Sequence, residues 1–228
     1  MISLTTILEE AFILGFDLLP DKKHLESGLN SDKLVVFVHG YSGIFSGTDV
    51  LKRNYARSVN TPLLLFDYSS RQPIEQISEQ LQRFLRQHGD RQYYLVGHSL
   101  GGIVVRYFND FVKDKEHVER AALIATPNRG TKAAYLRFRE SGRQVRPHSE
   151  FLASLDLKPL SVPYINILAQ GDEFIIPNHN AILDGAWNVI IKDRMHFTIL
   201  NDQRTYYFIK EFFECKDPNQ LPKNRVLL

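Results

Sequence analysis

Short apolar runs alternate with amphipathic segments along most of the chain, and this alternation restricts the possible fold more than any other feature of the sequence. The runs typical of buried strands are KLVVFVHG from Lys33, PLLLFDY from Pro62, QYYLVG from Gln92, RAALIAT from Arg120, PYINILAQ from Pro163 and WNVIIK from Trp187. Helical spacing of apolar residues marks segments 49–58, 73–87, 100–112 and 203–213. Strands that alternate with helices predict a mostly parallel sheet with helices on both faces.

Length and composition favour one globular domain spanning residues 1–228. The chain has 228 residues, of which 43% are hydrophobic and 24% charged, as in ordinary soluble proteins. Its formal net charge of +2 gives no reason to expect a nucleic-acid partner. A single cysteine, Cys215, excludes an internal disulfide framework and fits a reducing compartment. We therefore expect a cytoplasmic protein.

The first residues of the chain are apolar enough to suggest a signal peptide. They lack a basic beginning and a small-residue cleavage site, and Glu9 and Glu10 lie in their middle, so no export signal is predicted. No window reaches the ~18 apolar residues that a membrane span requires. The apolar residues between Ile2 and Leu18 indicate an irregular amphipathic helix that packs on its own domain, with contact to a lipid surface as the alternative.

The longest departure from the alternation is residues 128–161, which contain no convincing strand. A segment of this length is better interpreted as an inserted lid or cap than as a structureless loop, and its shortness predicts a modest lid. Its composition is basic, with Arg129, Lys132, Arg137, Arg139, Arg143, Arg146 and Lys158 against Glu140, Glu150 and Asp156. A solvated helical face and a site for an anionic substrate group both fit that bias.

One serine joins a predicted strand directly to a predicted helix. The stretch from Gly97 to Gly101, GHSLG, fits G-x-S-x-G in the strand–turn–helix context that this pattern requires. A sharp turn there lifts the Ser99 hydroxyl clear of the sheet, with a positive φ expected at the serine, and the two glycines remove colliding side chains. Gly102 is expected to let the helix approach a neighbouring strand. The helix points free N–H groups toward Ser99, the candidate nucleophile.

Four separated segments resemble the α/β-hydrolases, and within them the lipases and esterases. VFVHGYSG from Val36 resembles the oxyanion loop, GHSLGG from Gly97 the nucleophile elbow, ATPNRGT from Ala125 the segment after the next strand, and GDEFIIP from Gly171 the acid loop. The elbow is the most specific of these and the acid loop the least. The resemblance covers residues 33–213. It implies an α/β-hydrolase fold, a triad in the chain order serine, acid, histidine, and no need for a metal or organic cofactor.

The resemblance also implies an oxyanion hole made of two backbone N–H groups. These belong to Tyr41, after the HG pair, and to Leu100, after the nucleophile. Preorganised donors of this kind stabilise the charge on a tetrahedral intermediate, and removing one typically costs about 10²–10³ in rate. His39 is expected to order the oxyanion loop and His98 to line the elbow, so neither is predicted to act as the base.

The base is chosen from four histidines that follow Ser99. His117 precedes a strand, His148 lies in the predicted lid, and His179 follows the acid loop too closely for a strand to fit between them. His196 follows the last predicted strand and precedes the last helix, which is where the resembled family places its base. His196 is therefore the predicted proton acceptor.

The acid is chosen between two neighbours. Asp172 and Glu173 both follow the predicted strand that ends at Gln170. Counting back from Pro177 favours Glu173, whereas residue type and the freedom that Gly171 gives the loop favour Asp172. We expect Asp172, with Glu173 as the alternative; Asp193 is a more distant candidate. The acid would hold the histidine in the required tautomer and stabilise its charged form.

These residues together predict a serine hydrolase that cleaves carboxylic esters through an acyl-enzyme. The lipase-like segments favour a small or lipid-like substrate with an acyl chain. A thioesterase, an amidase or an acyltransferase on the same scaffold remains an alternative, because a fold does not fix its substrate. A binding protein on an inactive hydrolase scaffold is less favoured, since the candidate nucleophile and base are both present.

Overall fold

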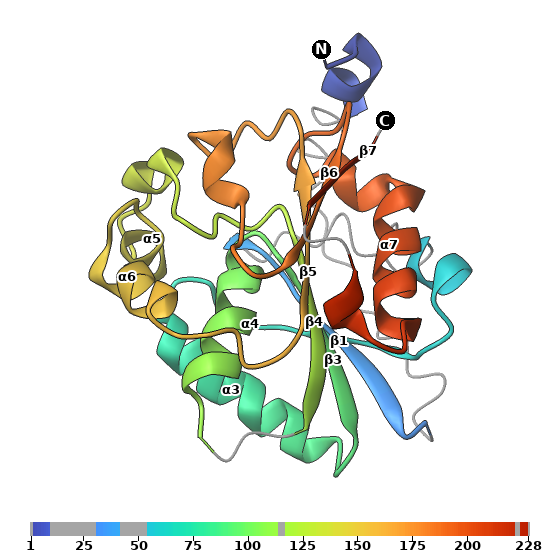
Figure 1. Cartoon of the computed structure of the whole chain (residues 1–228). Helices are drawn as coiled ribbons and strands as arrows, with labels where there is room; N and C mark the ends of the chain where they lie inside the picture. The colour runs from blue at the N-terminus through green and yellow to red at the C-terminus, as the bar shows by residue number, and fades with distance from the viewer. Residues whose placement is uncertain (1, 10–30, 42–53, 114–116, 222–223, 228) are drawn as a thin grey trace.

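A parallel sheet of seven strands runs through the part of the chain that the computed structural model describes, residues 2–9, 31–41, 54–113, 117–221 and 224–227 (Figure 1). The strand order is β2-β1-β3-β4-β5-β6-β7, and each neighbouring pair is parallel. The bounds are β1 Lys33–Val38, β2 Leu63–Phe66, β3 Gln92–His98, β4 Val118–Ile124, β5 Tyr164–Ala169, β6 Trp187–Ile191 and β7 Asn224–Leu227. The predicted fold class, a mostly parallel α/β sheet, is confirmed.

Six of these strands occupy the six predicted runs, and β7 lies in the C-terminal tail, where no strand is predicted. The sequence of the tail from Lys216 suggests a poorly ordered terminus whose last apolar residues could dock on the domain, and residues 224–227 do pair with β6 from Asn188 to Ile191. An edge strand has one neighbour only and therefore needs no continuous apolar pattern to be recruited to the sheet.

Helices cover both faces of the sheet (Figure 1). On one face lie α3 (Ile74–Gln87) and α4 (Leu100–Phe111), and on the other lies α7 (Gln203–Glu214). Residues 4–9 and 54–58 are also helical, so the described parts of the predicted helices at 2–18 and 49–58 are consistent with prediction, while 10–18 and 49–53 lie outside the described residues. None of the described helices is long and apolar enough to cross a membrane.

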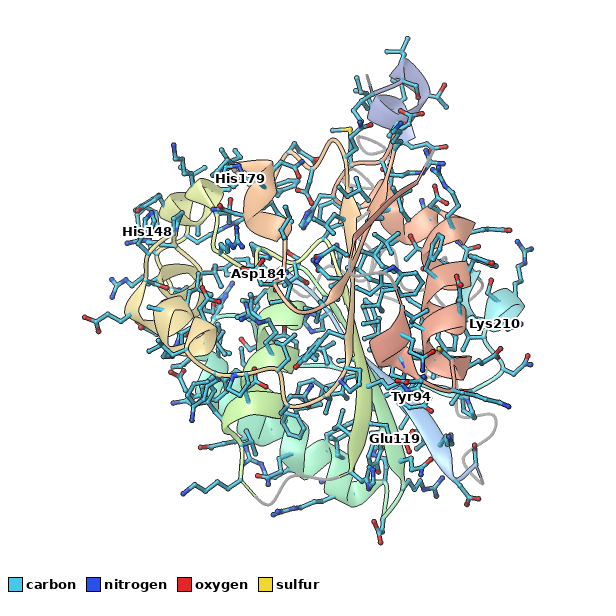
Figure 2. The ribbon with its side chains drawn as sticks, in the orientation of Figure 1. Tyr94, Glu119, His148, His179, Asp184 and Lys210 are labelled. Carbon is cyan, nitrogen blue, oxygen red and sulfur yellow. The ribbon has the colours of Figure 1, made fainter. Side chains whose placement is uncertain are left out.

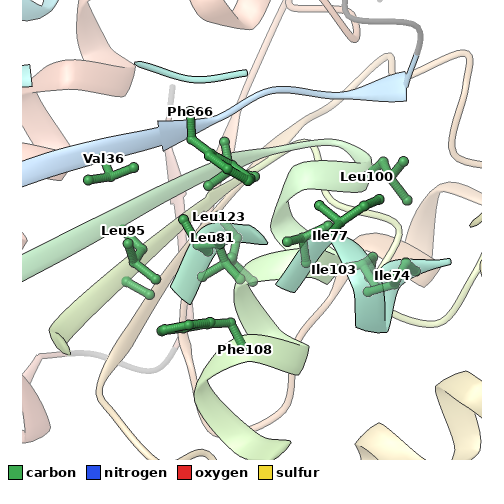
Figure 3. Packing of buried hydrophobic residues seen from close by; sticks show 14 of the residues in the cluster. Val36, Phe66, Ile74, Ile77, Leu81, Leu95, Leu100, Ile103, Phe108 and Leu123 are labelled. Atoms are coloured by element: carbon green, nitrogen blue, oxygen red, sulfur yellow. The ribbon is translucent and has the colours of Figure 1, made fainter. Parts of the chain in front are cut away.

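The core is divided between the two faces because alternate strand residues point to opposite sides. In β1, Val36 belongs to the cluster shared with α3 and α4, which Figure 3 shows around Ile77 and Ile103. Phe37, the next residue, belongs to the cluster shared with α7. Both faces are dry, so the sheet is a rigid platform whose strand ends and following loops can carry a site.

The segment 128–161 contains three short helices and no strand. They are η2 (Lys132–Leu136), α5 (Glu140–Gln144) and α6 (Glu150–Asp156), which lie on the side of α3 and α4 (Figure 1). The guanidinium of Arg106 in α4, only 2% exposed, donates to the carbonyl of Asn128 at 3.0 Å and to Asp156 at 3.1 Å. A buried side chain thus ties both ends of the segment to the main domain. Whether the segment acts as a lid stays a prediction.

Candidate active site

Ser99 lies alone between the end of β3 and the start of α4. Its φ of 53° and ψ of −121° place it in a strained conformation, with the positive φ expected from the sequence. The N–H of Ser99 donates to the carbonyl of Ile124 at 2.9 Å, which fastens the turn to β4. The serine is half-buried, so its side chain stands at the surface of the carboxyl edge of the sheet.

Three glycines make this turn sterically possible. A Cβ on Gly97 would come within 2.6 Å of the backbone of Gly101 and Gly102. A Cβ on Gly101 would overlap the carbonyl of Val38 at the end of β1, and one on Gly102 would overlap the Thr126 side chain after β4. The first turn of α4 is therefore pressed between the ends of β1 and β4, the two strands that flank β3 in the sheet.

His196 and Asp172 form a buried hydrogen-bonded pair on two separate loops. Nδ1 of His196 lies 2.8 Å from Oδ2 and 3.0 Å from Oδ1 of Asp172. Because a carboxylate only accepts, Nδ1 carries the hydrogen and Nε2 is left with its lone pair. Oδ1 also accepts from the N–H groups of Phe174 and Ile175, both at 3.0 Å, which fixes the carboxylate plane.

Glu173 occupies a different place from Asp172, although the two are adjacent in the chain. Its Oε2 accepts from the backbone N–H of His196 at 3.2 Å. Its Oε1 is buried without a hydrogen-bond partner among the described residues. Asp172 thus orients the ring, whereas Glu173 holds the backbone of the loop that carries it.

The histidine loop lies directly against the nucleophile elbow. Nε2 of His98, the residue before Ser99, donates to the carbonyl of His196 at 3.1 Å, and the two imidazole rings are 4.9 Å apart. Phe174 and Phe197 flank His196, each with a ring centroid 5.1 Å away. The structure thus brings the candidate nucleophile, base and acid to one place from three segments far apart in the sequence.

The candidate oxyanion loop passes over the serine. A Cβ built on Gly40 would lie 3.1 Å from the Cβ of Ser99, so the loop approaches as closely as a glycine permits. Tyr41 follows Gly40. Leu100 is the first residue of α4, and its N–H therefore has no acceptor within the helix. Both predicted donors border the serine.

His39 orders this loop through its neighbours. Its Nδ1 donates to the carbonyl of Gly40 at 2.8 Å, and its Nε2 accepts from the N–H of Tyr68 at 3.3 Å. The ring stacks on Tyr68 at 4.1 Å, and the Tyr68 hydroxyl donates to the His39 carbonyl at 2.6 Å. Tyr68 follows β2 and was not singled out from the sequence. Its position after a strand of a parallel sheet was the available signal.

Burial keeps two of the three histidines at the site uncharged. It lowers the pKa of His98 to about 3, with the nearby His196 lowering it further and the bond to the His196 carbonyl opposing the change. Burial also lowers the pKa of His39, against the opposing bond to Gly40. Neither ring adds a positive charge beside His196 at neutral pH.

The other candidate residues lie elsewhere. His117 is exposed just before β4, at the opposite edge of the sheet, where its carbonyl accepts from Tyr93 at the start of β3. His148 and His179 are exposed on the insertion and on η3 (Asn178–Ala181), as Figure 2 shows. The Asp193 carboxylate accepts from the N–H of Ser3 at 2.5 Å and so faces the N-terminal segment.

The described residues contain no cluster of histidine, cysteine or acidic side chains suited to a metal ion. Cys215 is half-buried and free. The site brings together a serine, a histidine whose Nδ1 bonds a fixed carboxylate, and the backbone of Tyr41 and Leu100, all of them protein groups. Such a set can form and break an acyl bond.

Comparison with known proteins agrees with this arrangement. The family model described as the alpha/beta hydrolase fold matches residues 33–149, and the chain belongs to this family. The matched range contains the elbow, the oxyanion loop and the first part of the insertion. A search among curated proteins gave no match.

Solved lipase and esterase structures share the fold at low sequence identity. The chain superposes on lipase B from Aspergillus fumigatus with a TM-score of 0.72 and 16% identity, covering 87% of this chain and 57% of that one. On mature lipase BlEst2 from Bacillus licheniformis it superposes with a TM-score of 0.66 and 18% identity, covering 84% of this chain and 93% of that one. On carboxylesterase CesB from Bacillus subtilis the TM-score is 0.56 and the identity 14%, with 94% of this chain and 98% of that one covered. The chain therefore spans little more than half of the first of these structures.

Proposed function

We propose that this protein hydrolyses carboxylic esters through an acyl-enzyme on Ser99. The observation that carries the proposal is the buried bond between His196 and Asp172 on a loop packed against the strained serine turn. It leaves Nε2 of His196 unprotonated and available to take a proton. The lipase and esterase neighbours, which share the fold, support the same class of reaction.

In the first half of the proposed reaction, Ser99 Oγ attacks the ester carbonyl carbon while its proton passes to Nε2 of His196. The carbonyl π electrons move onto oxygen, where the N–H groups of Tyr41 and Leu100 stabilise the negative charge. Asp172 stabilises the imidazolium without taking its proton. When the tetrahedral intermediate collapses, the alcohol departs with the proton from His196, and the acyl group stays on Ser99.

In the second half, water replaces the serine hydroxyl as the nucleophile. His196 accepts a proton from water, hydroxide adds to the acyl carbon, and the second tetrahedral intermediate expels Ser99 with that proton. Cleavage of a thioester or an amide, or transfer of the acyl group to an alcohol, would use the same residues, so these are the rival reactions. Competing nucleophiles in a product analysis separate acyl transfer from hydrolysis, and matched thioester and amide substrates test the other two.

The proposal is tested by following p-nitrophenyl esters of graded acyl length and labelling by a fluorophosphonate probe. Ser99→Ala should abolish both the turnover and the adduct. His196→Gln should lower kcat by about 10³-fold or more, whereas the matched variant His117→Gln, at an exposed site on the opposite sheet edge, should not change it. Unchanged turnover in Ser99→Ala would refute the nucleophile, and absence of any adduct in the parent protein would favour an inactive scaffold.

A further inference from the structure

An open pocket of about 400 Å³ lies beside the candidate oxyanion loop. One wall is the segment Tyr68 to Arg71 after β2, and the other is Leu136 to Arg139 between η2 and α5. Tyr41 also lines it, and the preceding residue, Gly40, is the one that approaches Ser99. A group bound in this pocket would therefore be close to the reacting carbonyl.

The charged side chains that line the pocket are all positive. Its nine described lining residues include three arginines, Arg71, Arg137 and Arg139, and no acidic residue. Within the described part of the chain, no ion pair neutralises any of these three guanidinium groups. The nearby carboxylate of Glu140 pairs instead with Arg143 at 3.7 Å, outside the pocket. Three unneutralised cations around one hollow favour an anionic occupant.

Other arginines of the insertion already have partners. Arg129 pairs with Asp184 at 2.7 Å, and the guanidinium of Arg146 lies 5.0 Å from the centre of the Tyr135 ring. The insertion is thus not a uniform solvated basic face. Of the insertion's arginines, Arg137 and Arg139 line the pocket, and neither forms an ion pair within the described part of the chain.

Hydrogen bonds hold the two walls of the pocket together. Gln144 in α5 accepts from the N–H of Ile74 at 2.8 Å and donates to Glu75 at 2.6 Å, both at the start of α3. The buried Ser141 hydroxyl donates to the carbonyl of Ser70. The walls therefore keep their spacing without a ligand, so little ordering cost is left for binding.

The rim of the pocket combines a positioned cation with apolar surface. The Arg137 guanidinium lies over the Tyr41 ring at 4.7 Å. Leu136 and Phe138 are 78% and 80% exposed on either side of it. An arginine fork binds carboxylate and phosphate oxygens in pairs, and the exposed side chains offer contact to an alkyl chain.

We propose that this pocket binds an anionic group, a phosphate or a carboxylate, carried by the ester substrate. The inference rests on the esterase function proposed above and narrows it to amphiphilic esters with an anion near the scissile bond. In this proposal the pocket determines which substrate binds, and the site around Ser99 carries out the chemical step.

The test uses short, freely dissolved substrates in matched charged and neutral pairs. One pair is 1-butanoylglycerol 3-phosphate and 1-butanoylglycerol; the other is mono-4-nitrophenyl glutarate and 4-nitrophenyl pentanoate. In one pair or both, kcat/KM for the charged member should be more than about ten times that for the neutral member. The pair that shows this preference tells whether the pocket favours a phosphate or a carboxylate. The double variant Arg71→Gln, Arg139→Gln should reduce that ratio about tenfold or more, while Arg143→Gln on the same insertion keeps it. Equal rates within both pairs, or a preference that survives in the double variant, would overturn the proposal.

Binding separates this inference from the esterase proposal. Calorimetric titration of 1-butanoylglycerol 3-phosphate and mono-4-nitrophenyl glutarate into Ser99→Ala needs no turnover. If one of these two ligands binds, and the added substitutions Arg71→Gln and Arg139→Gln weaken that binding about tenfold or more, the result would support the anion site even if the parent protein hydrolysed no ester. Hydrolysis of all four esters with no charge-dependent binding would instead retain the esterase function and remove the anion site.

Discussion

His98 and His196 lie with their rings 4.9 Å apart, and the proposed reaction needs only one of them to accept a proton. Two imidazolium ions at that separation would repel each other strongly in a buried site. Burial lowers the pKa of His98 to about 3, so His98 stays neutral when His196 takes the serine proton in the proposed reaction. The residue next to the nucleophile thus contributes a hydrogen bond and no charge.

The low pKa of His98 predicts a loss of stability in mild acid. The unfolded state binds the proton near the ordinary histidine pKa of 6.5 and the folded state only near 3, so this contribution to stability is complete above pH 6.5 and falls as the pH drops toward 3. The free energy of unfolding should be about 1.4 kcal/mol lower at pH 5.5 than at pH 7.5 from this group alone. Denaturant titrations at the two pH values measure it.

The variant His98→Gln supplies the comparison for that prediction. A glutamine can still donate to the His196 carbonyl but does not titrate, so the pH-dependent difference should shrink by about the same 1.4 kcal/mol. His117→Gln, at an exposed position, should keep the parent's difference. A full acid-induced loss in His98→Gln would assign the effect to other groups, with His39 the next candidate.

The two neighbouring acids should also behave differently. Asp172→Asn replaces one of the two oxygens beside Nδ1 of His196 with an NH₂ donor, which favours the wrong tautomer, and kcat on p-nitrophenyl esters should fall about 10³–10⁴-fold. Glu173→Gln keeps an oxygen for the His196 N–H at the position now bonded at 3.2 Å, so kcat should change by less than about tenfold. Comparable losses in the two variants would mean that both carboxylates act on the base.

At the scale of elements, buried Arg106 joins α4 to both ends of the insertion. Arg106→Met would leave the Asn128 carbonyl and Asp156 without this donor, at a cost of about 2–4 kcal/mol in the free energy of unfolding. Asp156→Asn keeps an oxygen acceptor on a side chain that is 53% exposed and should cost about 1 kcal/mol or less. Chemical denaturation measures both, and hydrogen exchange should locate the loosening in α6. Equal costs would show that the ion pair, and not the carbonyl bond, carries the anchoring.

The elements themselves could largely be predicted from the sequence, because each internal strand is a dense apolar run and each long helix has a regular apolar face. The turn at Ser99 could be predicted for the same reason: a strand and a helix leave one residue between them. The choice between Asp172 and Glu173 could not, since both follow β5 and only the loop's path decides which carboxylate turns to the histidine. The pocket could not be predicted either, because its walls come from segments about seventy residues apart whose contact depends on Gln144 and Ser141.

At the scale of the whole molecule, β7 extends a sheet that would otherwise end at β6. Parallel pairing of residues 224–227 covers the backbone groups of β6 on that side. Truncation after residue 223 should therefore lower the midpoint of thermal unfolding and raise the tendency to aggregate through the exposed edge. Thermal melts with light scattering test this. A truncated protein that melts and scatters like the full chain would show that β7 contributes nothing to the sheet in solution.

The part of the insertion that lines the pocket has a neck at Thr131 and Val145. The N–H of Thr131 donates to the carbonyl of Val145 at 3.0 Å, which closes residues 132–144 into a loop at its base. The Thr131 hydroxyl bonds the backbone of Phe174 and Ile176, so the neck rests on the acid loop itself. All insertion residues that line the pocket lie beyond this neck. If the pocket selects the substrate as proposed, residues 132–144 form an exchangeable cassette: apart from Ser141 and Gln144, which bond to the main domain, their sequence could be rewritten for another substrate while Ser99, His196 and their supports stay in place.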